Sequence, residues 1–407
     1  MIILTAKPLD AVRQAWKLSG FTFVQVAAGP GVTVMSSNRY LKGLSTHFLL
    51  GCSLINWFRL LWSNRRQPLS LHGFPKFLFV TAIILLLTPF RLADRLISSI
   101  RLKRVVFKQD PVFVLGHWRS GTTYLVNILS CDPQFGVTNA VHCFAPHLFL
   151  GAYRLCDWIL RRVLPKKRPM DNIEIDTISS QEEEFAMANI TPCSFYHMTV
   201  FQRNWRTYSH YMDLTDIPEK DISEWKQRYH YLLKKVTCQL KGKQLLLKSP
   251  VNTCRIRYLL ELFPNAKFVH IYRNPYQVFA STRKLYKRLF PLFGIQSAVE
   301  DEAASEEVQM KLYENMYNKF FAEKNLIPEN RLVEIRYEDL VSDPSGVVQF
   351  IYTQLNLPGY PEIQSKLDSY IKSKKNYQSN QYVMDPETMI KLSARFRFLL
   401  DKWGYKI

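Results

Sequence analysis

A strand–loop–helix segment near residue 116 constrains the fold of this chain more than any other feature. The apolar run Val112–Leu115 ends at Gly116, and an apolar helical pattern begins at Tyr124. The loop between them leads into a helix N-terminus, where several backbone N–H groups have no intrahelical partner. Such groups bind tetrahedral anions. The segment therefore predicts an α/β fold with an anion site at the end of a strand.

The spacing of the glycines indicates which anion is bound. Gly116 and Gly121 are spaced as in the loops that bind nucleoside triphosphates, where Lys and then Ser or Thr come next. Here Thr122 occupies the Lys position and Thr123 follows it. The missing Lys argues against ATP or GTP, and Arg119 supplies a cation inside the loop instead. The alternative is a strand, glycine turn and helix without any ligand.

Two further apolar runs end in a cation. The run Gln244–Lys248 ends at Lys248, and the run Lys267–Tyr272 is followed directly by Arg273. Ser281 comes eight positions after Arg273, in a helical pattern. Ligand sites of α/β proteins form at the carboxyl ends of parallel strands. Both runs therefore place a cation where a ligand site is expected.

Together these motifs resemble those of sulfotransferases that use 3′-phosphoadenosine 5′-phosphosulfate (PAPS). Residues 119–123 resemble their 5′-phosphosulfate loop, and Arg273 with Ser281 resembles their 3′-phosphate pair. Residues 248–250 and 262–268 resemble segments of tyrosylprotein sulfotransferases and related bacterial enzymes. The resemblance covers about residues 105–407. It implies a P-loop sulfotransferase-like parallel sheet flanked by helices, PAPS as the donor substrate, and no metal.

The resemblance also implies roles for individual residues. Arg119 and Lys248 would stabilise the charge that develops on the leaving group, and Arg273 with Ser281 would hold the 3′-phosphate that distinguishes PAPS from ATP. The basic stretch 372–377 resembles a late nucleotide-contacting loop, although a solvated charge run explains it nearly as well. The expected donor-binding residues are Arg119, Ser120, Gly121, Thr122, Thr123, Arg273, Ser281, Lys375 and Asn376.

The general base is expected among three consecutive carboxylates. The segment 181–185 resembles Gln-Glu-Asp-Glu-Phe of bacterial PAPS sulfotransferases, with Glu183 in place of the Asp. Adjacent carboxylates repel one another, which raises the pKa of one of them and makes it a better base. Glu182 and Glu184 are therefore both candidate catalytic residues. The structural alternative is a capping box between Ser180 and Glu183 at a helix N-terminus.

Two histidines are the other candidates for the base. In tyrosylprotein sulfotransferases the catalytic Glu follows shortly after the turn equivalent to residues 132–136, but this chain has no carboxylate from residue 137 to residue 150. His142 and His147 lie in that interval. A lone histidine near Phe and Pro is more often a packed structural residue, so the sequence leaves the identity of the base open.

The chain is expected to divide into an N-terminal region, 1–105, with membrane-associating apolar helices, and a sulfotransferase domain, 106–407. Residues 77–90 are almost purely apolar but shorter than the ~20 residues that a perpendicular span needs. A buried core helix, a re-entrant hairpin and an interfacial anchor are all compatible with this stretch, and we favour membrane attachment. Basic residues flank it, and the positive-inside tendency then places the catalytic part in the cytoplasm.

The amino-acid composition limits which binding partners are expected. A net charge of +20 and a pI of about 9.6 suit nucleic acid, anionic lipid or a polyanionic substrate. The chain carries no helix-turn-helix, finger or aromatic-platform signature, so no nucleic-acid partner is expected. Its seven cysteines are scattered and form no C-x-x-C pair, which argues against a zinc site and indicates reduced thiols in a cytosolic domain.

The sequence thus predicts an enzyme that transfers the sulfuryl group of PAPS to a hydroxyl acceptor. The apolar N-terminal stretch and the aromatic-rich residues 190–240 favour an acceptor that is a lipid or another hydrophobic molecule. A soluble alcohol or a peptide tyrosine is the alternative acceptor. The alternative functions are an ATP-dependent phosphotransferase resembling P-loop kinases and an inactive, membrane-attached nucleotide-binding protein.

Overall fold

Five parallel strands form the central sheet, in the order β2-β3-β1-β4-β5. In the computed structural model, β1 pairs with β3 through Val112 and Leu246 and with β4 through Val112 and Lys267. The chain runs from β1 to β2 and β3 on one side, and then crosses to β4 and β5 on the other. The connections therefore diverge at β1 and β4, and ligands of open α/β sheets bind at such a switch point. The strands are β1 (Val112–Leu115), β2 (Phe135–Val137), β3 (Gln244–Lys248), β4 (Lys267–Tyr272) and β5 (Leu332–Arg336).

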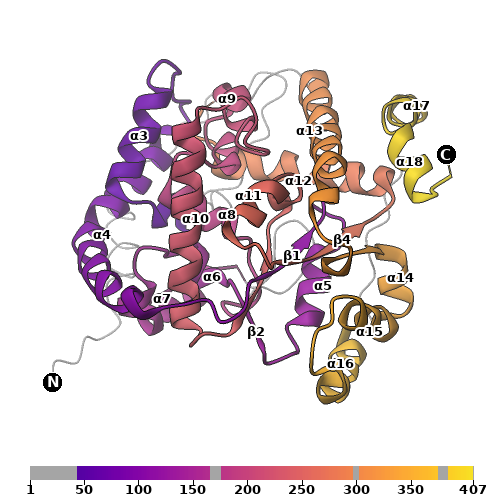
Figure 1. Ribbon diagram of the computed structural model, residues 1–407. Coiled ribbons are helices and arrows are strands. Elements are labelled where there is room, and N and C mark those ends of the chain that lie inside the picture. Colours follow the sequence, from indigo (N-terminus) through magenta and orange to yellow (C-terminus); the bar gives the residue numbers. More distant parts are fainter. Residues whose placement is uncertain (1–43, 166–175, 297–301, 375–383, 407) are drawn as a thin grey trace. The chain divides into compact units, whose positions relative to one another are not determined.

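Helices cover both faces of this sheet (Figure 1). The structure describes residues 44–165, 176–296, 302–374 and 384–406. Among the longer helices are α3 (Leu54–Asn64), α4 (Phe74–Arg101), α5 (Thr122–Leu129), α7 (Phe149–Val163), α8 (Glu183–Ile190), α10 (Glu219–Gln239), α12 (Pro275–Phe293), α13 (Glu302–Glu323), α15 (Pro344–Gln354), α16 (Tyr360–Lys374) and α17 (Pro386–Arg395). Shorter helices are α6 (Ala140–Phe144), α9 (Trp205–Ser209), α11 (Ile256–Leu262), α14 (Tyr337–Ser342) and α18 (Arg397–Trp403).

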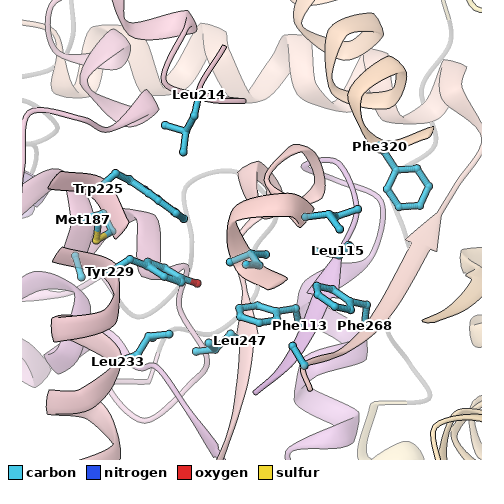
Figure 2. Packing of buried hydrophobic residues seen from close by; sticks show 14 of the residues in the cluster. Phe113, Leu115, Met187, Leu214, Trp225, Tyr229, Leu233, Leu247, Phe268 and Phe320 are labelled. Atoms are coloured by element: carbon cyan, nitrogen blue, oxygen red, sulfur yellow. The ribbon is translucent and has the colours of Figure 1, made fainter. Parts of the chain in front are cut away.

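The strands are apolar throughout because both of their faces are covered, as is usual for parallel sheets. Side chains of β1 alternate between two cores: Val112 and Val114 pack with α5, α15 and α16, whereas Phe113 and Leu115 pack with α10 and α13. Figure 2 shows Phe113 beside Phe268 of β4, and their rings stack with centroids 5.5 Å apart. Each such buried side chain contributes roughly 1.5–3 kcal/mol. The predicted α/β fold with a parallel sheet flanked by helices is confirmed.

The apolar stretch before the sheet forms a helix longer than the sequence indicates. The run 77–90 lies inside α4, which continues through Pro89 to Arg101 over 28 residues, about 42 Å. By length and composition alone, one helix in the described part of the chain, Phe74–Arg104, is long and apolar enough to cross a membrane. The helix continues past residue 90 because Arg91 and Asp94 turn toward the protein, where both are buried.

The N-terminal helices pack directly onto the catalytic part. Trp57 of α3 and Val80 of α4 belong to the same apolar cluster as Trp118 of the loop after β1. The residues that the structure describes, from 44 onward, belong to one compact unit. The division at residue 105 therefore stays a prediction about roles and not about separately folded parts.

Candidate active site

The loop after β1 is built to expose backbone N–H groups. Gly116, Arg119 and Gly121 all have positive φ, at 143°, 73° and 104°. Glycine is required at two of these positions: a Cβ on Gly116 would lie 2.5 Å from the carbonyl oxygen of Ile271, and one on Gly121 would lie 2.4 Å from the ring of Tyr337. Turns with such left-handed residues can gather backbone N–H groups into a concavity that binds an anion. Gly121 is also the N-cap of α5.

Hydroxyl groups surround the same loop. Thr122 and Thr123 are the first residues of α5, and the Thr253 hydroxyl accepts a hydrogen bond from the Gly116 N–H at 2.8 Å. Ser120 is fully buried, and its Oγ has no hydrogen-bond partner among the described residues. A buried hydroxyl without a partner costs free energy unless a ligand satisfies it. The residues of the loop thus fit a tetrahedral anion.

The ends of β1 and β4 bring the second predicted motif to this loop. Arg119 Nε donates to Ser281 Oγ of α12 at 2.8 Å. Arg273, directly after β4, donates from Nη1 to the carbonyl oxygen of Arg119 at 3.4 Å, and its guanidinium stacks on Tyr337 at 4.3 Å. Residues separated by more than 150 positions in the sequence therefore meet at the switch point of the sheet.

The ends of β2 and β3 bring a carboxylate to the third cation. Thr138, just after β2, exchanges two hydrogen bonds with Gln181, at 2.9 and 2.7 Å. These bonds fix Glu182 beside β3, where Lys248 Nζ donates to Glu182 Oε1 at 3.0 Å. The Lys248 side chain is buried, whereas Glu182 keeps 17% of its side chain exposed. An ion pair with partial access to solvent thus stands at the same sheet edge as the loop.

Aromatic side chains form the wall around Glu182. The Tyr196 hydroxyl donates to Glu182 Oε2, and Trp118 Nε1 donates to the Tyr196 oxygen at 3.0 Å. Phe185 contacts the Tyr196 ring edge-on, and Phe195 stacks on Trp118. Burial raises the pKa of the Tyr196 phenol well above 10, so that it acts as a hydrogen-bond donor. Sequence reasoning did not identify Trp118 and Tyr196 as site residues, although Trp118 lies within the loop motif itself.

The other two carboxylates of the cluster face the interior. Glu184 is 1% exposed and is bound by Arg255 Nη1 at 2.8 Å and by Ser194 Oγ at 2.8 Å. Glu183 is fully buried and accepts hydrogen bonds from Tyr229 and Asn252. The capping box suggested by the sequence does not form, because α8 begins at Glu183 with Glu182 as an N-cap whose side chain makes no capping bond.

The comparisons with known proteins agree with this geometry. A model of the sulfotransferase family matches residues 111–362. The chain belongs to the sulfotransferase family. Over 359 residues it is 30% identical to the omega-hydroxy-beta-dihydromenaquinone-9 sulfotransferase Stf3 of Mycobacterium bovis and of Mycobacterium tuberculosis. That alignment covers 88% of this chain and 90% of each relative.

Solved structures show the same fold. The crystal structure of sulfotransferase STF9 from Mycobacterium avium superimposes with a TM-score of 0.63 at 17% identity, covering 94% of this chain and 99% of that one. STF1 from Mycobacterium tuberculosis gives 0.55 at 16% identity, covering 96% and 98%. The prediction of a sulfotransferase is confirmed over that of an ATP-dependent phosphotransferase or an inactive nucleotide-binding protein. PAPS is the donor that this family generally uses.

The two histidines that the sequence offers as bases are bonded to groups other than the Lys248–Glu182 pair. His142 is buried between the Asn139 N–H and the Gln239 side chain, and burial lowers its pKa to about 4. His147 contacts the carbonyl oxygen of Asn189, and burial lowers its pKa to about 3. Both rings are therefore packed structural groups.

Two predicted donor-binding residues, Lys375 and Asn376, lie outside the described residues. The remaining predicted residues gather at the carboxyl ends of the strands, except Glu184, which is bound to Arg255 in the interior. The arrangement can hold an anion at the loop, supply cations at both of its ends, and present a carboxylate beside an aromatic wall.

Proposed function

We propose that this sulfotransferase transfers the sulfuryl group of PAPS to a hydroxyl group of a lipid-like acceptor. The observation that carries the proposal is the convergence of Arg119, Ser281 and Arg273 at one end of the loop with the Lys248–Glu182 pair at the same sheet edge. Such a site can bind a donor with phosphate groups at both ends of an adenosine and can deprotonate an acceptor beside it.

Residues of this chain would carry each part of the reaction. The backbone N–H groups of the loop and the Ser120 hydroxyl would hold the 5′-phosphosulfate, and Arg273 with Ser281 would hold the 3′-phosphate. The acceptor oxygen would attack sulfur, forming one S–O bond while the bridging S–O bond breaks. Glu182 would take the acceptor proton. Adenosine 3′,5′-bisphosphate would leave with the bridging oxygen.

Charge stabilisation would come from two cations. Lys248 and Arg119 would face the negative charge that develops on the bridging oxygen, which is the role of preorganised donors in group transfer. Lys248 also positions Glu182 at the sheet edge, because its Nζ donates to Glu182 Oε1 at 3.0 Å. Glu182 is the proposed base, since it keeps 17% of its side chain exposed, whereas Glu184 is enclosed with Arg255 at 1% exposure.

The acceptor is proposed from the relatives and from the wall of the site. The relatives that are 30% identical over most of the chain are named for a hydroxylated dihydromenaquinone, which is a lipid. In this chain the aromatic side chains of Trp118, Phe185 and Tyr196 stand around the proposed base. A hydroxyl group at the end of an apolar chain suits such a wall better than a charged metabolite does.

The cellular setting is proposed with it. We infer that the enzyme works at a membrane surface with its catalytic part in the cytoplasm and without a nucleic-acid partner. Support comes from the apolar helix α4 and from the basic residues that flank it.

A transfer assay tests the proposal. The full chain is incubated with PAPS labelled in the sulfuryl group and with a membrane lipid extract, and the products are separated and weighed by mass spectrometry. We expect label in a lipid fraction, together with release of adenosine 3′,5′-bisphosphate. Label confined to soluble alcohols or to peptide tyrosine would overturn the lipid-like acceptor. Failure of PAPS to serve as the donor would overturn the assignment of the donor site.

A further inference from the structure

The helix α4 turns three of its five charged residues, Lys76, Arg91 and Asp94, inward. Lys76 Nζ donates to the carbonyl oxygens of Pro291 and Gly294, at 2.6 and 3.2 Å. Arg91 donates to the carbonyl oxygens of Leu50 and Ile84, at 2.7 and 3.0 Å. These cations are buried and are bound by the protein itself.

The acid on α4 is held in the same way. Asp94 accepts hydrogen bonds from Lys235 Nζ of α10 and from the Gly151 N–H of α7, both at 2.7 Å. Both side chains of the Asp94–Lys235 pair are at most 3% exposed. Breaking this pair to send α4 away from the protein would leave both charges without partners. This polar face therefore remains against the protein.

The outward face of α4 is apolar except in its last turns, where Arg95, Ser99 and Arg101 are also exposed. Its exposed large side chains are Phe74, Leu78, Leu85, Leu86, Phe90, Leu92, Leu96 and Ile100. A helix on the surface of a protein in water shows the opposite pattern, with apolar residues inward and charged residues outward. Exposed apolar surface of this extent marks a protein or membrane contact.

Two neighbouring helices extend the same surface. In Figure 1, α3 lies next to α4 at the left edge, and Trp57 of α3 donates to Thr81 of α4 at 3.0 Å. Residues Ile55, Phe58 and Trp62 of α3 point outward, as do Leu155, Trp158 and Ile159 of α7. The helix α7 packs on α4 through the Gly151–Asp94 bond. We call the exposed apolar residues of α3, α4 and α7 the apolar face.

Basic residues border the apolar face. Arg65 stacks on Trp62 at 4.3 Å, and Arg162 stacks on Trp158 at 3.7 Å. Arg95, Arg101, Lys103 and Arg104 are exposed along and after the last turns of α4. The only carboxylate between residues 44 and 109 is the buried Asp94. Tryptophan and arginine at the border of an apolar surface match the headgroup region of a bilayer with anionic lipids.

We propose that the apolar face docks onto an anionic lipid surface, with α4 lying in the plane of the membrane interface and not crossing the bilayer. A crossing helix would have to expose Lys76, Arg91 and Asp94 to hydrocarbon, whereas an interfacial helix leaves them bound to the protein. The proposal deepens the membrane setting proposed above and does not depend on the identity of the acceptor.

Vesicle binding by the full chain tests docking. The protein is mixed with vesicles of phosphatidylcholine and with vesicles that also contain phosphatidylglycerol, and the bound fraction is measured by flotation. The variant Leu86→Asp/Leu96→Asp is expected to lose at least about tenfold in affinity, because two apolar side chains leave the lipid. The matched control is Val341→Asp/Ile390→Asp, whose side chains are 52% and 71% exposed, against 65% and 69% in the test pair. Equal binding by both variants would overturn the proposal.

Two further measurements complete the test. Lys103→Ala/Arg104→Ala is expected to weaken binding to vesicles with phosphatidylglycerol but not to those without it. Labels on Leu78→Cys, Leu86→Cys and Leu96→Cys, corrected for the label taken up by the unsubstituted chain, should show equal and shallow quenching by spin-labelled lipids. A maximum of depth at residue 86 would indicate a crossing helix and would overturn the interfacial orientation.

The occupant of the apolar face and the transfer reaction are tested separately. If the apolar face instead covers a second copy of the chain, the Leu86/Leu96 variant converts a dimer to a monomer in sedimentation while vesicle binding stays unchanged, and the proposal is wrong. The same variants are assayed for transfer to an acceptor dissolved in detergent. If the Leu86/Leu96 variant keeps its activity in detergent but no longer binds vesicles, docking is supported. If the unsubstituted chain neither binds vesicles nor transfers the sulfuryl group in detergent, both the docking proposal and the proposed function are wrong.

Discussion

Charged side chains are buried in two regions of this sulfotransferase, the donor site at the sheet edge and the inward face of α4. On α4 the Asp94 carboxylate is bound by Lys235 and by the Gly151 N–H, and Arg91 donates to two carbonyl oxygens, with its Nε alone lacking a partner among the described residues. At the donor site the Ser120 hydroxyl is left without a partner among the described residues, and Glu182 keeps access to solvent. The comparison teaches that an unsatisfied buried atom does not by itself mark a ligand site: at the proposed donor site it stands next to an ion pair that keeps access to solvent, and on α4 it does not.

The three consecutive glutamates repeat this contrast on a smaller scale. Glu184 is enclosed by Arg255 and Ser194 and resembles the charges of α4 in that its partners are all supplied by the protein. Glu182 meets Lys248 at the open edge of the sheet. The following predictions test whether the two kinds of buried charge differ as proposed.

The largest expected effect concerns Glu182. Glu182→Gln should lower kcat by about 10²–10⁴-fold, because the acceptor proton loses its base. Its thermal unfolding temperature should fall less than that of Glu184→Gln, because Glu182 keeps 17% of its side chain exposed and Glu184 keeps 1%. Initial rates with labelled PAPS and calorimetry measure the two quantities. The control is Glu184→Gln. Its main effect should be a lower unfolding temperature and not a lower kcat, because Arg255 is left buried without its carboxylate. Normal turnover by Glu182→Gln would remove the distinction between the two carboxylates.

The next effect concerns the satisfied pair of α4. Lys235→Met should lower the free energy of unfolding by about 3–5 kcal/mol, because Asp94 remains buried without its cation. The double variant Lys235→Met/Asp94→Leu should recover part of that loss, since neither charge is left. Denaturant titration measures both, and kcat per folded molecule should not change. A fall in kcat without a fall in stability would place this pair in the catalytic machinery.

A moderate effect is expected for Arg273, the proposed donor-binding cation after β4. Arg273→Ala should raise the KM for PAPS about 10–100-fold with little change in kcat, because one charge-assisted contact to the 3′-phosphate is lost. Steady-state kinetics at saturating acceptor measures the change. Arg331→Ala removes an equal charge at the exposed start of β5 and should leave the KM unchanged. An equal rise in the KM for PAPS in both variants would show that PAPS binding depends on the net charge of the protein and not on the position of Arg273.

The last effect is a pH dependence of stability at Glu183, which leaves the donor site unchanged. Burial raises the pKa of this carboxyl from 4.5 to about 7. The folded protein therefore holds the proton more tightly than the unfolded chain does, and stability contributed by this group is lost as the pH rises from about 4.5 to about 7. Glu183→Gln lacks this loss, so its stability relative to the unsubstituted chain should improve by on the order of 3 kcal/mol across that window.

Unfolding titrations at pH 4.5, 6 and 8 measure the difference between the two proteins at Glu183. The buried histidines, whose pKa values are lowered, affect both proteins equally and cancel in the comparison. A difference that does not vary with pH would show that Glu183 titrates as an ordinary carboxyl.

The local pattern of apolar residues, glycines and cations was enough to predict the loop after β1 and the strands and helix around it. The apolar run before Gly116, the two glycines and the cations that follow β3 and β4 are all contiguous signals, because strands, turns and helix N-termini depend on neighbouring residues. The spacing of Arg273 and Ser281 is local too, since both lie within one strand–helix unit. Their meeting with Arg119 was then predictable from the rule that parallel strands end at the same edge.

Only the tertiary structure decided which partners each side chain contacts. Glu182 and Glu184 differ because Lys248 and Arg255 reach them from 66 and 71 positions away, and no pattern among residues 182–184 records those partners. Trp118 and Tyr196 became site residues for the same reason. The sequence showed that residues 77–90 are apolar, but the orientation of α4 depends on Lys235 and Gly151, which are distant in the chain. Long-range contacts assign each side chain its surroundings, and composition or periodicity cannot encode them.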